Sequence, residues 1–439
     1  MIDDTHMVPA GWRWAPAWVL GFVALWPVPG IAEAVLVLGS LAALAKLALS
    51  RFRGGARLLS AEAWALTSVL FFAYWLPEAV GAIDGMDQAR AIKEAAVDLR
   101  YLPFLWLAAS AVADARGRRI TFGGLGIIVG IWTLDALAQV TIGTSPLFFA
   151  LDSLKQQVSG HGFCAGEVVA IDRLSGVLGP CNLKLGQMLA SLSPFALYAA
   201  ARRSGVIGWC VASALVGAVI LLTGTRAAWI TYALVVLWSG WRLLGWKRLA
   251  LVFVFGAVTL GVLAVVAPQM RERLEQTTHV LAANEQGFDS AFSGRGRIWA
   301  AAWCMYREHP FNGVGPRGFR TAFAQCDPHP GELAAWGEGP ALHAHQLILE
   351  VASEAGTFGL LLWLAGIALA WRAWRYASTT AREHARPAML ALAVTLFPFN
   401  THLAFYSTFW GGLTLLLAAL FAGSLLARDV EAAPAPSHP

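Results

Sequence analysis

The 439-residue sequence is poor in charged side chains. Asp, Glu, Lys and Arg make up 13% of it, whereas a soluble domain carries roughly 25%. Hydrophobic residues make up 57% and occur in runs of about membrane length. This composition excludes an ordinary soluble domain and predicts a multi-span membrane protein. The 20 Trp residues agree with this, because Trp collects at membrane–water interfaces.

Several enzyme motifs are also missing. The sequence has no HExxH, no CxxC and no Walker loop, and no Asp-x-Asp in the loops expected outside the membrane. We find no internal repeat and no soluble catalytic domain with a long core of its own. We therefore expect no metal, no other cofactor and no nucleic-acid partner, and we expect any chemistry to take place at the outer membrane face.

The apolar runs predict an all-α polytopic membrane protein with about twelve transmembrane helices. The expected spans are 14–29, 31–49, 61–77, 101–114, 120–140, 183–200, 205–223, 227–240, 249–267, 346–371, 387–403 and 405–427. The chain then divides into residues 1–267 with nine spans, a long loop 268–345, residues 346–427 with three spans, and a disordered tail 428–439.

The positive charges predict the orientation of these spans. With alternate loops assigned to one side, five segments hold 15 Lys and Arg in 41 residues, against 13 in 146 residues on the other side. The dense side is cytoplasmic by the positive-inside rule. Both termini are then expected in the cytoplasm, and the long loops outside it.

Four of the five cysteines, Cys164, Cys181, Cys304 and Cys326, fall in or beside the outside loops. Local pairing would join Cys164 to Cys181 and Cys304 to Cys326, which an oxidising compartment permits. Four free thiols fit the sequence equally well. Cys210 falls inside a span and is expected to pack there.

The loop 268–345 is expected to contain amphipathic helices. The stretch "RGRIWAAAWCMYREHP" puts Ile298, Ala302 and Met305 on one face with Trp residues beside them, which is typical of an interfacial helix. Pro310 should end this helix. The following "FNGVGPRGF" supplies three Gly and a Pro, so we expect a tight turn there.

The stretch "ALHAHQLILEVASEAGTFG" leads from this loop into the next span. A helix over 346–371 is about 39 Å long, more than the ~30 Å hydrocarbon core, so His345 is expected at the lip of the membrane. A neutral imidazole there can accept a proton from a hydroxyl. A histidine that merely caps the helix is the competing interpretation. His343, two residues away, cannot share a helical face with His345 and is secondary. The residues expected on that face are His345, Leu349, Ala352, Gly356 and Gly359.

Several arginines are expected on the same side of the membrane. Arg226 lies between two apolar runs, Arg295 and Arg297 start the interfacial helix, and Arg173 and Arg100 each end an outside loop. Together they could clamp a doubly charged phosphate group. A boundary Arg226 that meets lipid phosphate, and a solvated pair Arg295 and Arg297, are the competing interpretations.

Several of these stretches resemble the O-antigen ligase and polymerase superfamily. "HQLILEVASEAGTFG" is similar to its pattern of His, Asn/Ser/Gln, nine residues, Gly, two residues and Gly. "SGRGRIWAAAWCMYREHPFNGVGPRGF" resembles its Arg and Trp followed by His-Pro and Gly-Val-Gly. "LLTGTRAAW" and "RLSGVLGPCNLKLG" resemble two further segments, with Cys181 inserted in the second. "FPFNTHLAFYSTFWGGL", which contains His402, looks like the penultimate loop of the ligase branch.

The resemblance implies a glycosyltransferase C-like fold in the bacterial inner membrane. It implies transfer of O-antigen polysaccharide from undecaprenyl pyrophosphate to lipid A–core on the periplasmic face, without a metal and with inversion. His345 would act as base or orient the acceptor hydroxyl, and Arg226 and Arg295 would stabilise the pyrophosphate. Further expected substrate-binding residues are Arg173, Arg297, Arg100, His343, Gln346 and His402. An O-antigen polymerase, a protein O-oligosaccharyltransferase and, in a different class, a transporter are the alternatives.

Overall fold

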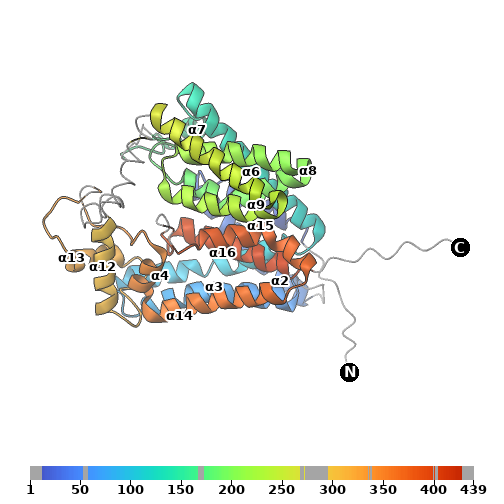
Figure 1. Cartoon of the computed structure of the whole chain (residues 1–439). Helices are drawn as coiled ribbons and strands as arrows, with labels where there is room; N and C mark the ends of the chain where they lie inside the picture. The colour runs from blue at the N-terminus through green and yellow to red at the C-terminus, as the bar shows by residue number, and fades with distance from the viewer. Residues whose placement is uncertain are drawn as a thin grey trace.

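The computed structural model describes residues 12–52, 58–166, 173–266, 271, 295–334, 336, 339–398, 400 and 404–427. Within these residues every regular element is a helix, which confirms the predicted all-α class. Long helices run alongside one another, while α4, α12 and α13 lie together at one end of the bundle, called here the loop end (Figure 1). Much of the predicted loop 268–345, and the tail 428–439, fall outside the described residues.

The helices are α1 (Ala15–Ala24), α2 (Pro29–Phe52), α3 (Ala61–Gly81), α4 (Gln88–Asp98), α5 (Tyr101–Ser110), α6 (Ala115–Ile142), α7 (Pro146–Ser159), the 3₁₀ turn η1 (Gly176–Leu178), α8 (Leu185–Leu222), α9 (Arg226–Val266), α12 (Arg295–Glu308), α13 (Phe319–Cys326), α14 (Leu347–Tyr376), α15 (Thr379–Thr395) and α16 (Thr408–Leu425).

Among the described residues, seven helices are long and apolar enough to cross a membrane: α2, α3, α6, α8, α9, α14 and α16. These helices confirm a multi-span membrane architecture, while the predicted number of twelve spans stays a prediction. Two expected pairs of spans are merged, because α8 turns at Ser204 and Gly205 and α9 turns at Gly245 without a separate loop. The counterparts of three other expected spans, α1, α5 and α15, have 10, 10 and 17 residues, fewer than the about 20 that a full crossing needs.

Helix α16 forms the centre of the bundle and packs against α3, α5 and α15. Its start is fixed by two buried tyrosines, because Tyr74 donates to the Phe405 carbonyl at 3.1 Å and Tyr101 donates to the Thr408 carbonyl at 3.0 Å. Gly423 lets α16 approach α5 closely, since a Cβ there would lie 2.2 Å from the Ala109 carbonyl oxygen. This packing fixes the segment before α16 next to the candidate site.

Both local disulfides form. Cys164 bonds to Cys181 and Cys304 bonds to Cys326, with Cα–Cα distances of 5.6 Å in each pair, and Cys210 is a free thiol in α8. The first bond joins the segment after α7 to the segment before α8. The second joins α12 to the last residue of α13. Of the two possibilities left open by the sequence, the structure has the pairing and not the four free thiols.

Candidate functional site

The first part of the site is the turn between α8 and α9. Gly224 has a φ of 66°, and the Thr223 hydroxyl donates to the Ile220 carbonyl at 2.8 Å. The indole N–H of Trp229 donates to the same carbonyl at 3.2 Å, so side chains before and after the turn both bind the end of α8. Arg226, one of the predicted catalytic residues, is the first residue of α9 and is half-buried at this turn.

Arg295 lies close to Arg226, although residues 227–294 separate them in the sequence. Arg295 is the first residue of α12, and burial together with the charge of Arg226 lowers its pKa to about 10. Each arginine therefore stands at a helix N-terminus, where backbone N–H groups also favour anions. Two neighbouring guanidinium groups repel each other, and a doubly charged anion between them would remove that cost.

Helix α12 has the amphipathic character that the sequence predicts. Ile298, Ala302 and Met305 are buried on one face, while Trp303 is exposed. The helix packs against α14, so the helix that begins with Arg295 is a direct neighbour of the helix that follows His345. The disulfide at Cys304 and the buried face together fix the direction of α12.

The prediction that His345 shares a helical face with Leu349 and the residues after it is wrong, because His345 is not in the helix. Helix α14 begins at Leu347 with Gln346 as its N-cap, and His345 precedes it with a φ of 52°, a left-handed conformation rare for a residue with a Cβ. His345 and His343 are consequently in contact, with ring centroids 3.8 Å apart and the His345 N–H donating to His343 Nδ1 at 3.3 Å. The two histidines therefore form one contacting pair.

Glu350 approaches this pair through His343. Its Oε2 is 3.7 Å from His343 Nδ1, an ion pair when the imidazole is protonated, and the residue is 1% exposed. The backbone of Phe405 and Tyr406, in the segment before α16, lies beside this carboxylate. The acid thus joins the histidines to the last loop of the protein. The sequence predicts no role for Glu350.

Gln346 was predicted to bind substrate, but its side chain has other partners. Its Oε1 accepts the Leu349 N–H at 2.5 Å, which caps α14, and its Nε2 donates to the Pro398 carbonyl at 3.1 Å. Gln346 therefore positions the start of α14 against the segment that follows α15. Its neighbour His345 owes its place to this cap.

The loop 309–318 packs into a break in α14. Gly356 has φ 63° and ψ −162°, so the helix is interrupted there, whereas the sequence predicted it to be continuous. On one side of the break, Val314 donates to the Ser353 carbonyl at 2.8 Å; on the other, Thr357 donates to the Pro310 carbonyl at 2.8 Å. Backbone groups freed by the break are thereby satisfied by the loop.

Glycines make this joint possible. A Cβ on Gly356 would lie 2.3 Å from the Phe311 carbonyl oxygen, and a Cβ on Gly313 would lie 2.4 Å from the Glu354 carbonyl carbon. Gly315, at φ 87°, meets the backbone of Gly81 and Gly85 next to the end of α3. The Gly-rich turn predicted after α12 is therefore a packing motif between α3 and α14.

A second group of charges gathers around this joint. The Arg317 N–H donates to the Glu354 carboxylate at 3.0 Å, and Glu354 and Glu78 are 2% and 1% exposed. Lys184, the residue before α8, has its pKa lowered by burial and by the charge of Arg317. Burial also lowers the pKa of Arg320, with Arg317 and Arg90 contributing. Sequence reasoning missed this group, because its members come from four distant segments and none completes a motif.

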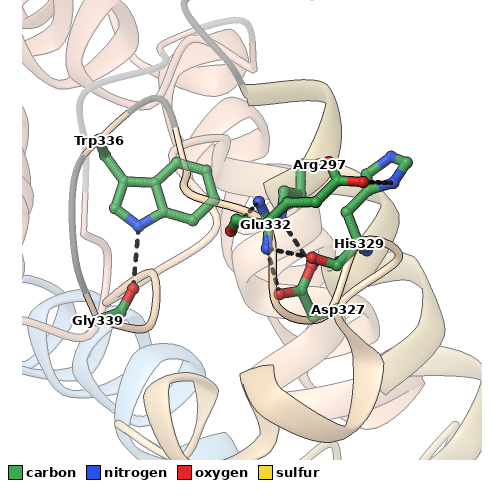
Figure 2. A network of polar contacts seen from close by, with 6 residues as sticks. All are labelled: Arg297, Asp327, His329, Glu332, Trp336 and Gly339. Atoms are coloured by element: carbon green, nitrogen blue, oxygen red, sulfur yellow. Dashed lines mark hydrogen bonds and ion pairs between the residues drawn. The ribbon is translucent and has the colours of Figure 1, made fainter.

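Arg297 was expected to bind substrate together with Arg295, but it has an internal partner (Figure 2). Its Nε and Nη2 donate to the two carboxylate oxygens of Asp327 at 2.7 and 2.6 Å, which lowers the pKa of Asp327. Arg297 also donates to the carbonyls of His329 and Glu332 and stands over the Trp336 ring. It organises the segment after α13.

The remaining predicted residues lie apart from these groups or outside the description. Arg100 pairs with Glu33 at 2.6 Å and borders a small cavity of about 620 Å³ beside α4. Arg173 precedes η1, whose Gly176 N–H donates to Gln139 of α6 at 2.7 Å. His402 lies outside the described residues.

Among the described residues, the group with metal-binding geometry is Cys304, Glu308 and Cys326, in which the two sulfurs are joined as a disulfide. The bonded sulfurs do not fit a metal-thiolate site, because thiolate ligation requires free, deprotonated cysteines. The site is accordingly described by its arginine, histidine and carboxylate side chains.

Comparison with known proteins bears on the segment that carries most of these residues. No curated protein matches the chain. A family model described as O-antigen ligase matches residues 211–364, a segment that includes Arg226, Arg295, the loop 309–318 and His345. Members of this family are membrane glycosyltransferase-like enzymes. Residues 211–364 are therefore similar to the O-antigen ligase family, in agreement with the resemblance of the sequence to that superfamily.

Proposed function

We propose that the protein is an O-antigen ligase of the bacterial inner membrane. It transfers O-antigen polysaccharide from undecaprenyl pyrophosphate to lipid A–core on the periplasmic face. The observation that carries this proposal is the proximity of Arg226 and Arg295, because the charge of one lowers the pKa of the other. A pyrophosphate is the group that such a pair fits best.

The proposed reaction is a direct displacement. An acceptor hydroxyl oxygen attacks the anomeric carbon, the bond from that carbon to the pyrophosphate oxygen breaks, and undecaprenyl pyrophosphate leaves with the bonding electrons. The hydroxyl proton passes to His345. Arg226 and Arg295 stabilise the negative charge that develops on the leaving group, so no general acid is required. The anomeric configuration is inverted.

The other predicted residues take supporting roles in this proposal. Gln346 holds the start of α14 against Pro398, and Arg297 holds the segment after α13 through Asp327. His343, in ring contact with His345 and 3.7 Å from Glu350, orients the base. Arg100 and Arg173 are proposed to contact the glycan or its phosphates at the loop end.

Two disulfides support the proposed side of the membrane. Disulfides persist in the periplasm and are rare in the cytoplasm. The Cys304–Cys326 bond lies in the segment that carries Arg295, so this segment belongs in an oxidising compartment. The Lys- and Arg-rich loops are then cytoplasmic, in agreement with the positive-inside rule.

The test is ligation by the purified protein with lipid-linked O-antigen and lipid A–core, in the presence of EDTA. We expect product from the wild type and from Arg248→Ala, a charge change far along α9, and a strongly reduced rate from Arg226→Ala or Arg295→Ala. Longer lipid-linked glycan instead of ligated lipid A–core would identify a polymerase. Product only with a protein acceptor would identify a protein O-oligosaccharyltransferase.

A further inference from the structure

A large cavity lies between α6, α8 and the start of α15. Its volume is about 1060 Å³, and the two halves of α8 form two of its walls because the helix turns back at Ser204 and Gly205. Arg226, Arg295 and the histidine pair do not line it. On α6 its lining runs from Ala115 to Leu134, so the cavity follows most of that helix.

The lining is divided into a charged end and an apolar length. The charged end contains Arg118, Arg119, Arg202, Arg203, Glu383 and His384. Beyond it the wall of α6 consists of Gly, Ile, Phe and Leu residues and one Thr, Thr133, and Ile127 and Leu134 are 65% and 60% exposed. The distance from Arg119 to Leu134 along the helix is about 22 Å. One leaflet of the hydrocarbon core is about 15 Å thick, so the apolar length is sufficient for an acyl chain.

Positive charge is in excess at the charged end. Glu383 already accepts hydrogen bonds from Arg242 at 2.7 Å and from Arg386 at 2.6 Å. Within the described part of the chain, Arg119, Arg202 and Arg203 are exposed and have no carboxylate within 4.0 Å. Basic pockets between transmembrane helices are recognised by the head groups of anionic lipids.

We propose that this cavity binds one anionic phospholipid. Its phosphate lies at Arg119, Arg202 and Arg203, and one acyl chain lies along α6 past Gly123 and Gly130. A free phosphate would leave the apolar length empty, and a neutral phospholipid would leave the arginines without a counter-charge. The proposal is independent of the glycosyl transfer proposed above.

Two kinds of change test the two halves of the site. The double variant Arg202→Ala/Arg203→Ala removes exposed positive charge, and its matched control is Lys247→Ala/Arg248→Ala, which removes the same charge from exposed residues of α9 that do not line the cavity. Gly130→Leu fills the apolar length, and its control is Gly256→Leu. A Cβ at either glycine has nothing within 4 Å, so both side chains start in open space.

The measurement is binding of phosphatidylglycerol and phosphatidylcholine to the delipidated full-length protein by native mass spectrometry. We expect one retained phosphatidylglycerol, and affinity about tenfold lower for Arg202→Ala/Arg203→Ala, for Gly130→Leu and for phosphatidylcholine. Both controls should bind as the wild type does. Unchanged phosphatidylglycerol binding in either test variant overturns the proposal. Displacement of the phospholipid by inorganic phosphate, or by equimolar undecaprenyl phosphate, also overturns it, since it would identify an anion site or a donor-lipid site.

Discussion

The backbone N–H of Val314 donates to the carbonyl of Ser353 at 2.8 Å, and this contact joins the loop after α12 to the interrupted helix α14. The interruption depends on Gly356, whose φ of 63° and ψ of −162° belong to a region that is essentially restricted to glycine. The joint holds His345 and the segment 309–318 in fixed positions relative to each other.

Replacing Gly356 by alanine should therefore be strongly destabilising. The strained conformation costs of order 1–3 kcal/mol, and the new Cβ would lie 2.3 Å from the Phe311 carbonyl oxygen. We expect a lower melting temperature in detergent and little folded protein. Gly123→Ala, in open space on α6, is the control and should be neutral or slightly stabilising. Equal stability of the two variants would contradict the described joint.

His345→Gly separates the stability of this position from its chemistry. Glycine adopts a φ of 52° without strain, so His345→Gly should be about 1 kcal/mol more stable than His345→Ala, which keeps the strain. Both variants should lose about 10²-fold or more of ligation activity if the imidazole acts as base. Thermal unfolding and single-turnover ligation measure the two effects. A stable and fully active His345→Gly protein would remove the histidine from the mechanism.

Arg226→Ala and Arg295→Ala should each lower kcat/KM by about 10²–10³-fold, as expected when one stabilising donor is lost from a developing anion. The double variant should lose less than the product of the two single losses, because both groups act on one anion. Steady-state ligation with a double-mutant cycle is the measurement. Strictly multiplicative losses would mean that the two arginines act at separate places.

Removing the Cys304–Cys326 bond should loosen α12 from α13. The bond closes a loop of 22 residues, and a loop of this size corresponds to about 3 kcal/mol in the chain-entropy account. Cys304→Ser/Cys326→Ser should melt at a lower temperature than the wild type. Reducing agent should then no longer lower its melting temperature through this bond. Cys210→Ser, which changes a free thiol in α8, is the control. A melting temperature equal to that of the control would show that the Arg297–Asp327 contacts alone suffice.

Asp98 should give the protein a pH-dependent stability. Burial raises its pKa from 3.8 to about 7, and the charge of Arg100 opposes this. A carboxyl whose folded pKa is raised favours the folded state when protonated, so stability should fall as the pH rises from about 4 to 7. Each pH unit in this range lowers the free energy of unfolding by about 1.4 kcal/mol. Asp98→Asn should flatten this part of the pH profile in thermal unfolding, with Asp87→Asn as a control in the same region.

The sequence was sufficient for the features that depend on motifs or on composition. The all-helical membrane class follows from the apolar runs, and the amphipathic α12 follows from the spacing of Ile298, Ala302 and Met305. The joint role of Arg226 and Arg295 as phosphate ligands stays a prediction, and the structure adds that the charge of Arg226 acts on Arg295. In each case a periodic pattern or a short motif carries the information directly.

Other features depend on backbone conformation, which leaves a weaker trace in the sequence. Hydropathy counts apolar length, so it cannot distinguish a loop at 201–204 from the turn that α8 makes at Ser204 and Gly205. The start of α14 at Leu347 is one residue from the predicted 346, but the left-handed backbone of His345 had no signal in the sequence. The lowering of the Lys184 pKa by the charge of Arg317 depends on the tertiary fold alone.

The joint between the loop 309–318 and α14 uses main-chain groups on both sides. These backbone contacts therefore do not depend on the identity of the side chains around them, provided that Gly313, Gly315 and Gly356 are kept. Asn312 and Arg317 can change, and with them the charge presented beside α3, while the architecture stays the same. The joint thus constrains the chain at three glycines and leaves the side chains around it free to vary.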